Sequence, residues 1–448
     1  MTGSADATCL PAWPTHYARA GTHVWSKNEA PDPEEQKLHI RPWLSALIQG
    51  EHVNLLVGSG LTTAVGAAVD VAALDMGMVE FRHEMAGAIQ QAAEDAAERS
   101  ARGKPNFEDQ MRAVAELVSG LRILGLHGDK DASAQLRTWE REYETALQDF
   151  WHALLLSERQ IRDAFADGHV EGLRLLSSFF QTFSNRPGSR ERLHIFTTNY
   201  DRLIEYGCEF LGLRVLDRFV GRLSPVFRSS RPAVDLHYNP PGLRGEPRYL
   251  DGVVRLTKLH GSLDWHSRKT HLGGPEIVQH TLPFGAEPTD SEVSSRATNS
   301  LMIYPNAAKD TETLEYPYAD LFRDFAAAVC RPDTVLVTYG YGFGDDHVNR
   351  VIRDMLTIPS THLVILSYED TGRRAERFVK ASMREQQITI LVGEHFGSLF
   401  ELVEHYLPKP YIDFNLGTMT EILKRTRPDP HVGGGGQNEE PDGKVANV

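Results

Sequence analysis

Small polar residues, an asparagine and a histidine follow successive apolar runs of this chain. The apolar run at 53–57 leads into GSGLT, and the run at 193–196 leads into TTNYD. His260 and Gly261 follow a third run, and a glycine-rich turn that begins at Gly340 follows a fourth. An imidazole can accept a proton, an amide can orient a water or hydroxyl, and glycine-rich turns let backbone N–H groups approach a phosphate. We therefore expect these segments to build one reactive site.

The elements that carry these segments are short β-branched runs, which predict strands. Each is apolar almost throughout, which is typical of parallel strands covered by helices on both faces. The sequence thus predicts an α/β fold with a Rossmann-like, mostly parallel sheet, and its ligand site at the carboxyl ends of the strands. The six predicted strands are Val53–Val57, Leu193–Phe196, Val253–Leu256, Thr334–Val337, His362–Leu366 and Ile388–Val392.

A long stretch with helical periodicity separates the first two strands. Apolar residues recur every three or four positions from Phe107 to Leu124 and again from Leu147 to Leu155. One crossover needs far less chain, so we expect a large inserted helical module. The predicted organisation is an N-terminal arm at 1–40 (irregular over 1–36), an α/β domain at 41–75 and 186–410, the module at 76–185, and a C-terminal extension with a flexible tail at 411–448. Long loops are expected at 213–248 and 273–300.

The composition restricts the class of partner. The chain has 47 Lys+Arg against 61 Asp+Glu, a formal net charge of −14, which argues against direct nucleic-acid binding and against an anionic membrane surface. Its three cysteines, Cys9, Cys208 and Cys330, form neither a disulfide framework nor a CxxC metal pair. With no apolar leader and no membrane-spanning run, we expect a cytoplasmic protein.

Each motif alone has a plain structural explanation. Gly58-x-Gly60 is as well explained by a tight strand-to-helix turn as by a phosphate site. Asn199 suits a turn, and His260 suits a half-buried histidine with its hydrogen bonds made. Asp345 and Asp346 suit the cap and first turn of a helix that begins near His347.

The ordered combination resembles the sirtuin (silent information regulator) family of NAD-consuming enzymes. The family motif G-A-G-I-S is similar to residues 58–62, T-Q-N-I-D to 197–201, and H-G to 260–261. The resemblance covers about 45–70 and 190–405. Sirtuins that deacylate proteins carry a four-cysteine zinc ribbon after H-G, where this chain has only Cys330, so the resemblance implies a fold without that ribbon. The P-D-F-R and F-G-E motifs also have no clean match. The chain therefore looks like the sirtuin-like NADases of bacterial antiphage (abortive infection) defence.

This resemblance implies hydrolysis of NAD to nicotinamide and ADP-ribose, with Asn199 and His260 as catalytic residues and without zinc or another metal. The absence of an attached sensor domain further implies a homo-oligomer paired with a HerA-type ring ATPase. The alternatives are an ADP-ribosyltransferase, a protein deacylase, or a subunit that senses NAD or ADP-ribose. The expected NAD contacts are Gly58, Ser59, Gly60, Leu61, Thr62, Asp201, Gly340, Tyr341, Phe343, Asp345, Ser367 and Gly393.

Overall fold

The computed structural model describes most, but not all, of the 448 residues. The described residues are 13–27, 31–72, 78–99, 105–186, 190–230, 234–238, 248–269, 275–280, 282–287, 300–302 and 316–409. The expectations for the first twelve residues and for the C-terminal extension at 411–448 therefore lie outside them.

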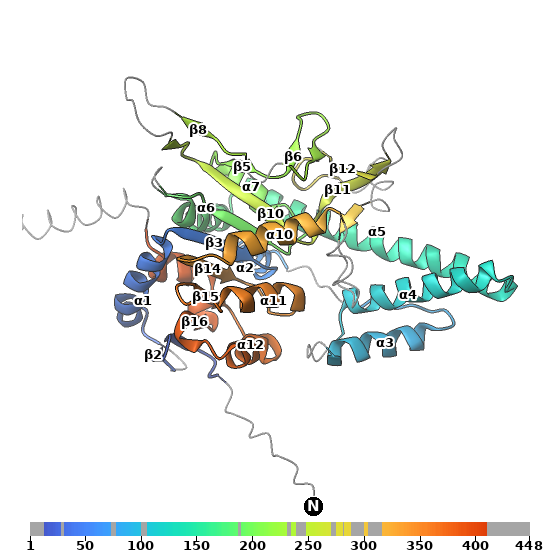
Figure 1. Cartoon of the computed structure of the whole chain (residues 1–448), viewed down its shortest axis with the longest axis horizontal. Coiled ribbons are helices and arrows are strands. Elements are labelled where there is room, and N and C mark those ends of the chain that lie inside the picture. The colour runs from blue at the N-terminus through green and yellow to red at the C-terminus, as the bar shows by residue number, and fades with distance from the viewer. Residues whose placement is uncertain are drawn as a thin grey trace, which may run out of the picture. The chain divides into compact units, whose positions relative to one another are not determined.

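A nine-stranded sheet forms the centre of the chain, in the order β2-β1-β16-β15-β14-β3-β4-β10-β5 (Figure 1). All six predicted strands are confirmed and pair in parallel. They are β3 (His52–Val57), β4 (His194–Thr197), β10 (Val253–Lys258), β14 (Thr334–Tyr339), β15 (His362–Ser367) and β16 (Ile388–Val392). Among the parallel strands, β3 comes first in the sequence; β4 and β10 follow on one side of it, and β14, β15 and β16 then follow on the other. This is the doubly wound Rossmann order, and its switch point lies between β3 and β14.

Two short strands extend the sheet where the sequence analysis expects an irregular segment. β1 (Tyr17–Ala20) pairs antiparallel with β16, and β2 (His23–Ser26) pairs antiparallel with β1. Arg19 interrupts the apolar pattern of β1, but it is buried and pairs with Glu385 at 2.6 Å. The expectation for residues 1–36 is therefore wrong over these strands, because a buried arginine paired with a partly exposed glutamate interrupts the apolar signal.

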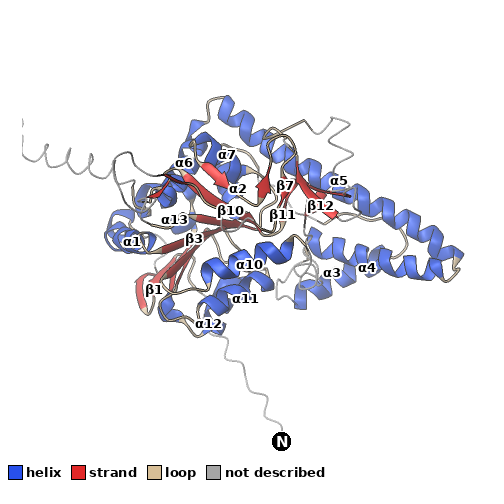
Figure 2. Cartoon of the chain, turned by 45° about the horizontal axis from the view of Figure 1, so that its top comes forward, coloured by secondary structure: helices blue, strands red, loops and turns tan. Residues whose placement is uncertain are grey.

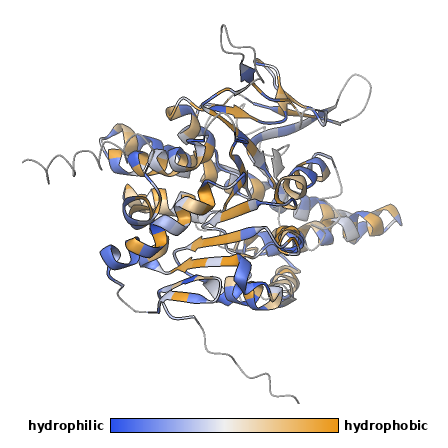
Figure 3. Cartoon of the chain, turned by 60° about the vertical axis from the view of Figure 1, so that its left-hand side comes forward, coloured by the Kyte–Doolittle hydropathy of each residue, from blue (hydrophilic) through white to orange (hydrophobic). Residues whose placement is uncertain are grey.

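Helices cover both faces of the sheet. α1, α2, α6 and α7 share an apolar cluster with strand residues such as Leu55, whereas α10, α11 and α12 share one with strand residues such as Leu56 (Figure 2). Adjacent strand residues thus point to opposite faces, both apolar, and the strands of the sheet appear largely hydrophobic in Figure 3. The bounds are Pro33–Ile48 (α1), Gly60–Ala68 (α2), Val170–Ser184 (α6), Leu203–Phe210 (α7), Tyr318–Val329 (α10), Asp346–Met355 (α11) and Arg374–Ser382 (α12). Short helices α13 (Glu394–Gly397) and α14 (Leu399–Glu401) and a π-helical turn (Leu402–Tyr406) follow β16.

The stretch between β3 and β4 is helical, as predicted. α3 (Ala86–Arg99), α4 (Phe107–Leu126) and the first part of α5 (Lys130–Ala166) pack around Val114 and Trp139. The end of α5 and all of α6 instead pack against the sheet. The inserted module at 76–185 stays a prediction. Its last helix would be α6, which covers the sheet. None of the described helices has both the length and the apolar composition needed to cross a membrane.

A second, antiparallel sheet has the strand order β13-β11-β12-β7-β6. Its strands are β6 (Phe219–Val220), β7 (Val226–Phe227), β11 (Gly261–Lys269), β12 (Pro275–Gln279) and β13 (Ser300–Met302). Three more short strands, β5 (Arg214–Leu216), β8 (His237–Tyr238) and β9 (Arg248–Tyr249), complete the described set. The regions expected to be long loops therefore contain strands. Because β11 begins at Gly261, His260 lies where the chain passes from one sheet to the other.

Candidate active site

The loop after β3 and the turn after β14 meet at the switch point of the sheet. The N–H of Gly58 donates to the carbonyl of Tyr339 (3.0 Å), and the N–H of Gly60 donates to the carbonyl of Gly340 (3.1 Å). A Cβ atom on Gly60 would lie 2.5 Å from the Gly340 Cα, and Gly340 has a φ of +60°. Glycine is thus required by the close approach of two backbones. These two N–H groups are already engaged, so they are not the phosphate donors that the sequence analysis expects in this loop.

Substituting Gly60 with alanine is expected to force the two loops apart. We expect a loss of about 1–3 kcal/mol in the free energy of unfolding, as for other overpacked sites, together with weaker binding at the cavity described below. Urea unfolding checks this, with Gly87→Ala as the matched control. A Cβ on Gly87, which lies in α3, meets nothing within 4 Å, so that variant should be as stable as the wild type or slightly more stable. Equal stability of the Gly60→Ala variant and the wild type would contradict the close-approach argument.

Asn199 joins the loop after β4 to the loop after β3. Its Nδ2 donates to the Gly58 carbonyl (3.1 Å) and to Thr62 Oγ1 (3.3 Å). The Thr62 hydroxyl in turn donates to Asp201 Oδ2 (2.9 Å), whose other oxygen accepts from the Leu203 N–H at the start of α7. These hydrogen bonds use the amide nitrogen of Asn199 within the protein, which leaves its amide oxygen as the atom for a ligand. They also show that Asp201 holds the loop in place.

A buried lysine supports this loop from the end of β10. Lys258 Nζ donates to the Asp201 carbonyl (2.6 Å) and pairs with Glu205 (3.0 Å). Burial raises the pKa of Glu205, while the Lys258 ammonium opposes that rise. Lys258 therefore positions the Asn199 loop by binding the backbone carbonyls of Tyr200 and Asp201.

A buried ion pair fixes the same loop to α5. Glu158 and Arg202 are 2% and 6% exposed, and Arg202 Nη2 donates to Glu158 Oε2 at 2.5 Å. Glu158 Oε1 also accepts from the backbone N–H of Arg202 (2.8 Å), and Arg202 reaches the carbonyls of Leu282 and Pro283. Burial alone would lower the pKa of Arg202, but the neighbouring Glu158 carboxylate raises it. Arg202 therefore stays charged, and the pair holds three segments together.

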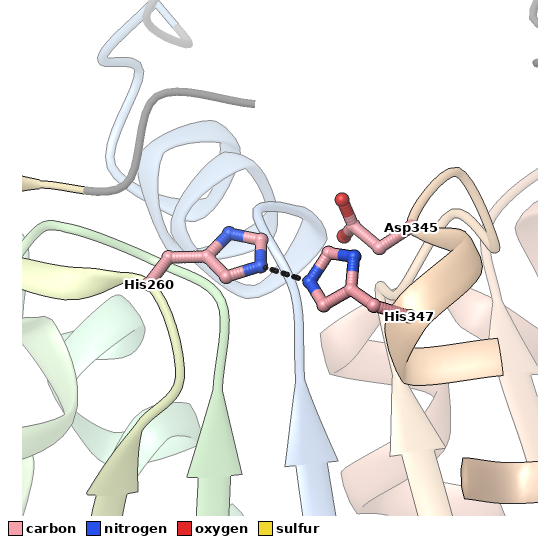
Figure 4. Close-up of side chains that lie close together, drawn as sticks. All are labelled: His260, Asp345 and His347. Atoms are coloured by element: carbon pink, nitrogen blue, oxygen red, sulfur yellow. Dashed lines mark hydrogen bonds between the residues drawn. The ribbon is translucent and has the colours of Figure 1, made fainter. Parts of the chain in front are cut away.

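His260 faces a second histidine from α11. Its Nε2 lies 2.9 Å from Nε2 of His347, and the side chain of Asp345 lies beside His347 (Figure 4). The two histidines are only 2% and 6% exposed. Asp345 is the N-cap residue of α11 and Asp346 lies in its first turn, as the sequence analysis expects, but Asp345 makes no side-chain capping hydrogen bond.

The turn between β14 and α11 is fixed by its own side chains. The Tyr341 hydroxyl donates to Asn349 Oδ1 (3.0 Å), and Asn349 Nδ2 donates to the Phe343 carbonyl (3.0 Å). Burial, and then the nearby Asp345 carboxylate, raises the pKa of Tyr341, so its hydroxyl stays protonated and can donate. These bonds hold the turn in place, and its Gly340, Gly342 and Gly344 line a cavity described next.

Two adjoining cavities open at these strand ends. The smaller, about 270 Å³, contains the catalytic candidates Asn199 and His260, and the larger, about 1040 Å³, extends over the ends of β15 and β16. Five residues line both: Ser59, Thr63, Gly340, Gly342 and Arg374. A dinucleotide that spans both cavities would have its central phosphates beside these five residues.

Most of the predicted contact residues line one of the two cavities. Those at the smaller are Gly58, Ser59, Thr62, Asp201, Gly340, Tyr341 and Asp345, and those at the larger include Ser59, Gly60 and Ser367. Leu61 and Phe343 do not line either; their side chains are buried in the clusters on the two faces of the sheet. Gly393 (φ +120°) lies against Thr15 and His16 instead, where a Cβ would come within 2.4 Å of the Thr15 carbonyl oxygen. Packing thus accounts for these three residues in the structure, and their contacts to NAD stay predictions.

The sequence analysis assigns no role to several residues that line the site. Arg374, at the start of α12, lies against the turn after β14: Cβ atoms on Gly342 and Gly344 would come within 3.2 and 3.0 Å of its guanidinium. It is the one arginine or lysine among the described residues lining either cavity. Phe150 and Leu154 of α5 form another wall. Their helical spacing predicts a buried face, but no local signal connects that face to the site.

The comparison with known families agrees with this geometry. Residues 193–386 match the SIR2-like domain. The matched segment contains Asn199, His260, the turn after β14 and Arg374, and it supports a sirtuin-like, NAD-related activity in general. The loop after β3 precedes the segment, and Gly393 follows it. No curated protein matches the chain.

Proposed function

We propose that the chain cleaves NAD at the bond between nicotinamide and ribose, with water as the acceptor. The observation that carries the proposal is the meeting of Asn199 and His260 in the smaller cavity, at the switch point of a doubly wound sheet. Both residues belong to the segment that matches the SIR2-like domain. Ligands of such sheets bind at this crevice. The nicotinamide ribose would occupy the smaller cavity and the adenosine half the larger one.

The reaction needs positioning more than strong acid or base chemistry. The nicotinamide ring is cationic in NAD, and the electron pair of the breaking C–N bond neutralises it as it leaves. Water then adds to the electron-poor C1′ of the ribose and loses a proton to His260, which gives ADP-ribose. Asn199, held through its Nδ2, would orient the water or a ribose hydroxyl without adding charge.

Arg374 supplies the charge that the phosphates need. It lies where the two cavities join, and a guanidinium binds phosphate oxygens in a fixed, bidentate geometry. In this proposal Arg374 binds the phosphates instead of the Gly58 and Gly60 N–H groups, because those two groups donate to the turn after β14. Ser59 and Thr63, which line both cavities, would complete the contacts to the phosphates.

The first experiment incubates the purified chain with NAD and no acyl peptide, and analyses the products by chromatography and mass spectrometry. We expect nicotinamide and ADP-ribose, with the rate lowered about 100-fold or more in Asn199→Ala. Asn185→Ala is the matched control, because Asn185 is an exposed residue at the end of α6. An Asn199→Ala variant that cleaves NAD at the wild-type rate would contradict the assignment.

The other products distinguish the alternative functions. ADP-ribose attached to protein would indicate a transferase, and turnover only with an acyl peptide would indicate a deacylase. Intact NAD that still binds to the chain would favour a sensor. The deacylase is the weaker alternative because the acyl-lysine motif has no clean match in this sequence.

The biological setting is proposed on the resemblance to defence NADases alone. There the chain would act as the effector of an antiphage complex, as a homo-oligomer assembled with a HerA-type ring ATPase. If the isolated chain leaves NAD intact, the same assay repeated with that ATPase and DNA tests for gating. Mass photometry with and without the ATPase tests the assembly, and a monomer under both conditions would contradict it.

A further inference from the structure

The facing pair His260 and His347 belongs to a three-residue cluster with Asp345 (Figure 4). Each of the three residues offers one nitrogen or oxygen atom, and these atoms all lie within 4.8 Å of one another. They come from two separate elements: His260 follows β10, and the other two lie at the start of α11. The fold therefore brings together a donor set that no local sequence motif contains.

The donor types suit a divalent transition-metal ion. Two imidazoles and one carboxylate are a common ligand set for Zn²⁺ and its neighbours, and such sites keep a position open for water. Two nitrogens bound to one tetrahedral Zn²⁺ at about 2.0–2.1 Å lie about 3.3 Å apart, so the 2.9 Å pair needs to open by only a few tenths of an ångström. Asp345 adds a carboxylate oxygen within 4.8 Å of both imidazole nitrogens.

The surroundings provide both shielding and access. The two histidines are almost fully buried, which keeps their rings in place and limits competition from water. His260 and Asp345 line the smaller cavity, so an ion can enter from it and the open coordination position would face it.

We propose that His260, His347 and Asp345 form a binding site for one Zn²⁺-like ion, and that the bound ion inhibits the enzyme. A neutral imidazole has a single nitrogen lone pair, and a metal bound to His260 occupies it. His260 can then no longer accept a proton. The inhibitory part rests on the proposed NAD cleavage, whereas the binding part does not.

Metal binding is measured on the full chain after treatment with a chelator and desalting. Titration with Zn²⁺ is followed by calorimetry, and Co²⁺ serves as a spectroscopic probe because its visible absorption reports the ligand geometry. We expect one ion per chain, with an affinity about 10–100-fold weaker or lost in His347→Ala and in Asp345→Asn. His127→Ala is the control, because His127 is exposed at the end of α4 and should bind the ion as the wild type does.

The outcomes separate the two proposals. Equal Zn²⁺ affinity and Co²⁺ spectra in the wild type and both folded variants would overturn the site and show that the histidines only share a hydrogen bond. Circular dichroism identifies a variant that fails to fold, and the second variant then decides. Zn²⁺ binding that depends on the cluster, in a chain that never cleaves NAD, would keep the site and reject the proposed activity. Cleavage unaffected by saturating Zn²⁺ would reject the inhibition.

Discussion

Replacing His260 with alanine is expected to lower kcat for NAD cleavage by about 10²–10⁴-fold while NAD still binds. The imidazole is the one group of the smaller cavity proposed to accept a proton. Arg374, Ser59 and Thr63, which bind the phosphates in our proposal, are unchanged by this substitution. A loss of kcat with an unchanged dissociation constant would therefore place His260 in the chemical step.

Product formation gives kcat, and isothermal titration gives the NAD affinity of the same variant. His169→Ala is the matched control, because His169 is exposed and makes no capping hydrogen bond at the start of α6. Wild-type turnover in His260→Ala would remove the histidine from the mechanism. A parallel loss of NAD binding would instead make it a binding residue.

Replacing Glu158 with alanine is expected to cost about 3–5 kcal/mol in the free energy of unfolding. The substitution leaves the buried Arg202 guanidinium without its carboxylate, and it removes the acceptor of the Arg202 backbone N–H. Because Arg202 follows the Asn199 loop directly, we also expect loss of NAD cleavage below the temperature at which the variant unfolds.

Urea unfolding measures the cost, with Glu144→Ala as the control on the exposed side of the same helix. That variant should differ little from the wild type. Glu158→Gln keeps one acceptor oxygen without the charge, so its stability should lie between those of the wild type and Glu158→Ala. A Glu158→Ala variant as stable as the wild type would show that the pair is not needed to hold the loop.

The parallel core was predictable because its signal is local. Runs such as those in β3 and β16 are apolar on both faces, so burial can be inferred without knowing the neighbouring strands. The motifs at the strand ends were predictable for the same reason, since parallel strands place their carboxyl ends at one edge. Strand β1 was not, because the charge of its buried Arg19 is paired with Glu385, 366 residues away.

The remaining features of the site depend on contacts between distant segments. His347 and Arg374 are unremarkable within α11 and α12, and only the fold brings His347 to His260 and Arg374 to the glycine turn. The sequence also could not distinguish the glycines that face a ligand from those that face another backbone. Gly393 is an example of the second kind, since it lies against Thr15 and His16.

The position of β3 in the sequence determines which fragments of this chain can keep the central sheet intact. β3 is hydrogen-bonded to β14 on one side and to β4 on the other, yet it lies more than 130 residues before the segment that matches the SIR2-like domain. A fragment limited to 193–386 would keep both histidines and Asn199 but would lose the strand between them. The edges of β4 and β14 that pair with β3 would then have no partner strand. Unpaired edges in the middle of an apolar sheet can pair with other chains and lead to aggregation. The reactive groups of this protein are thus inseparable from a strand that lies outside the matched segment.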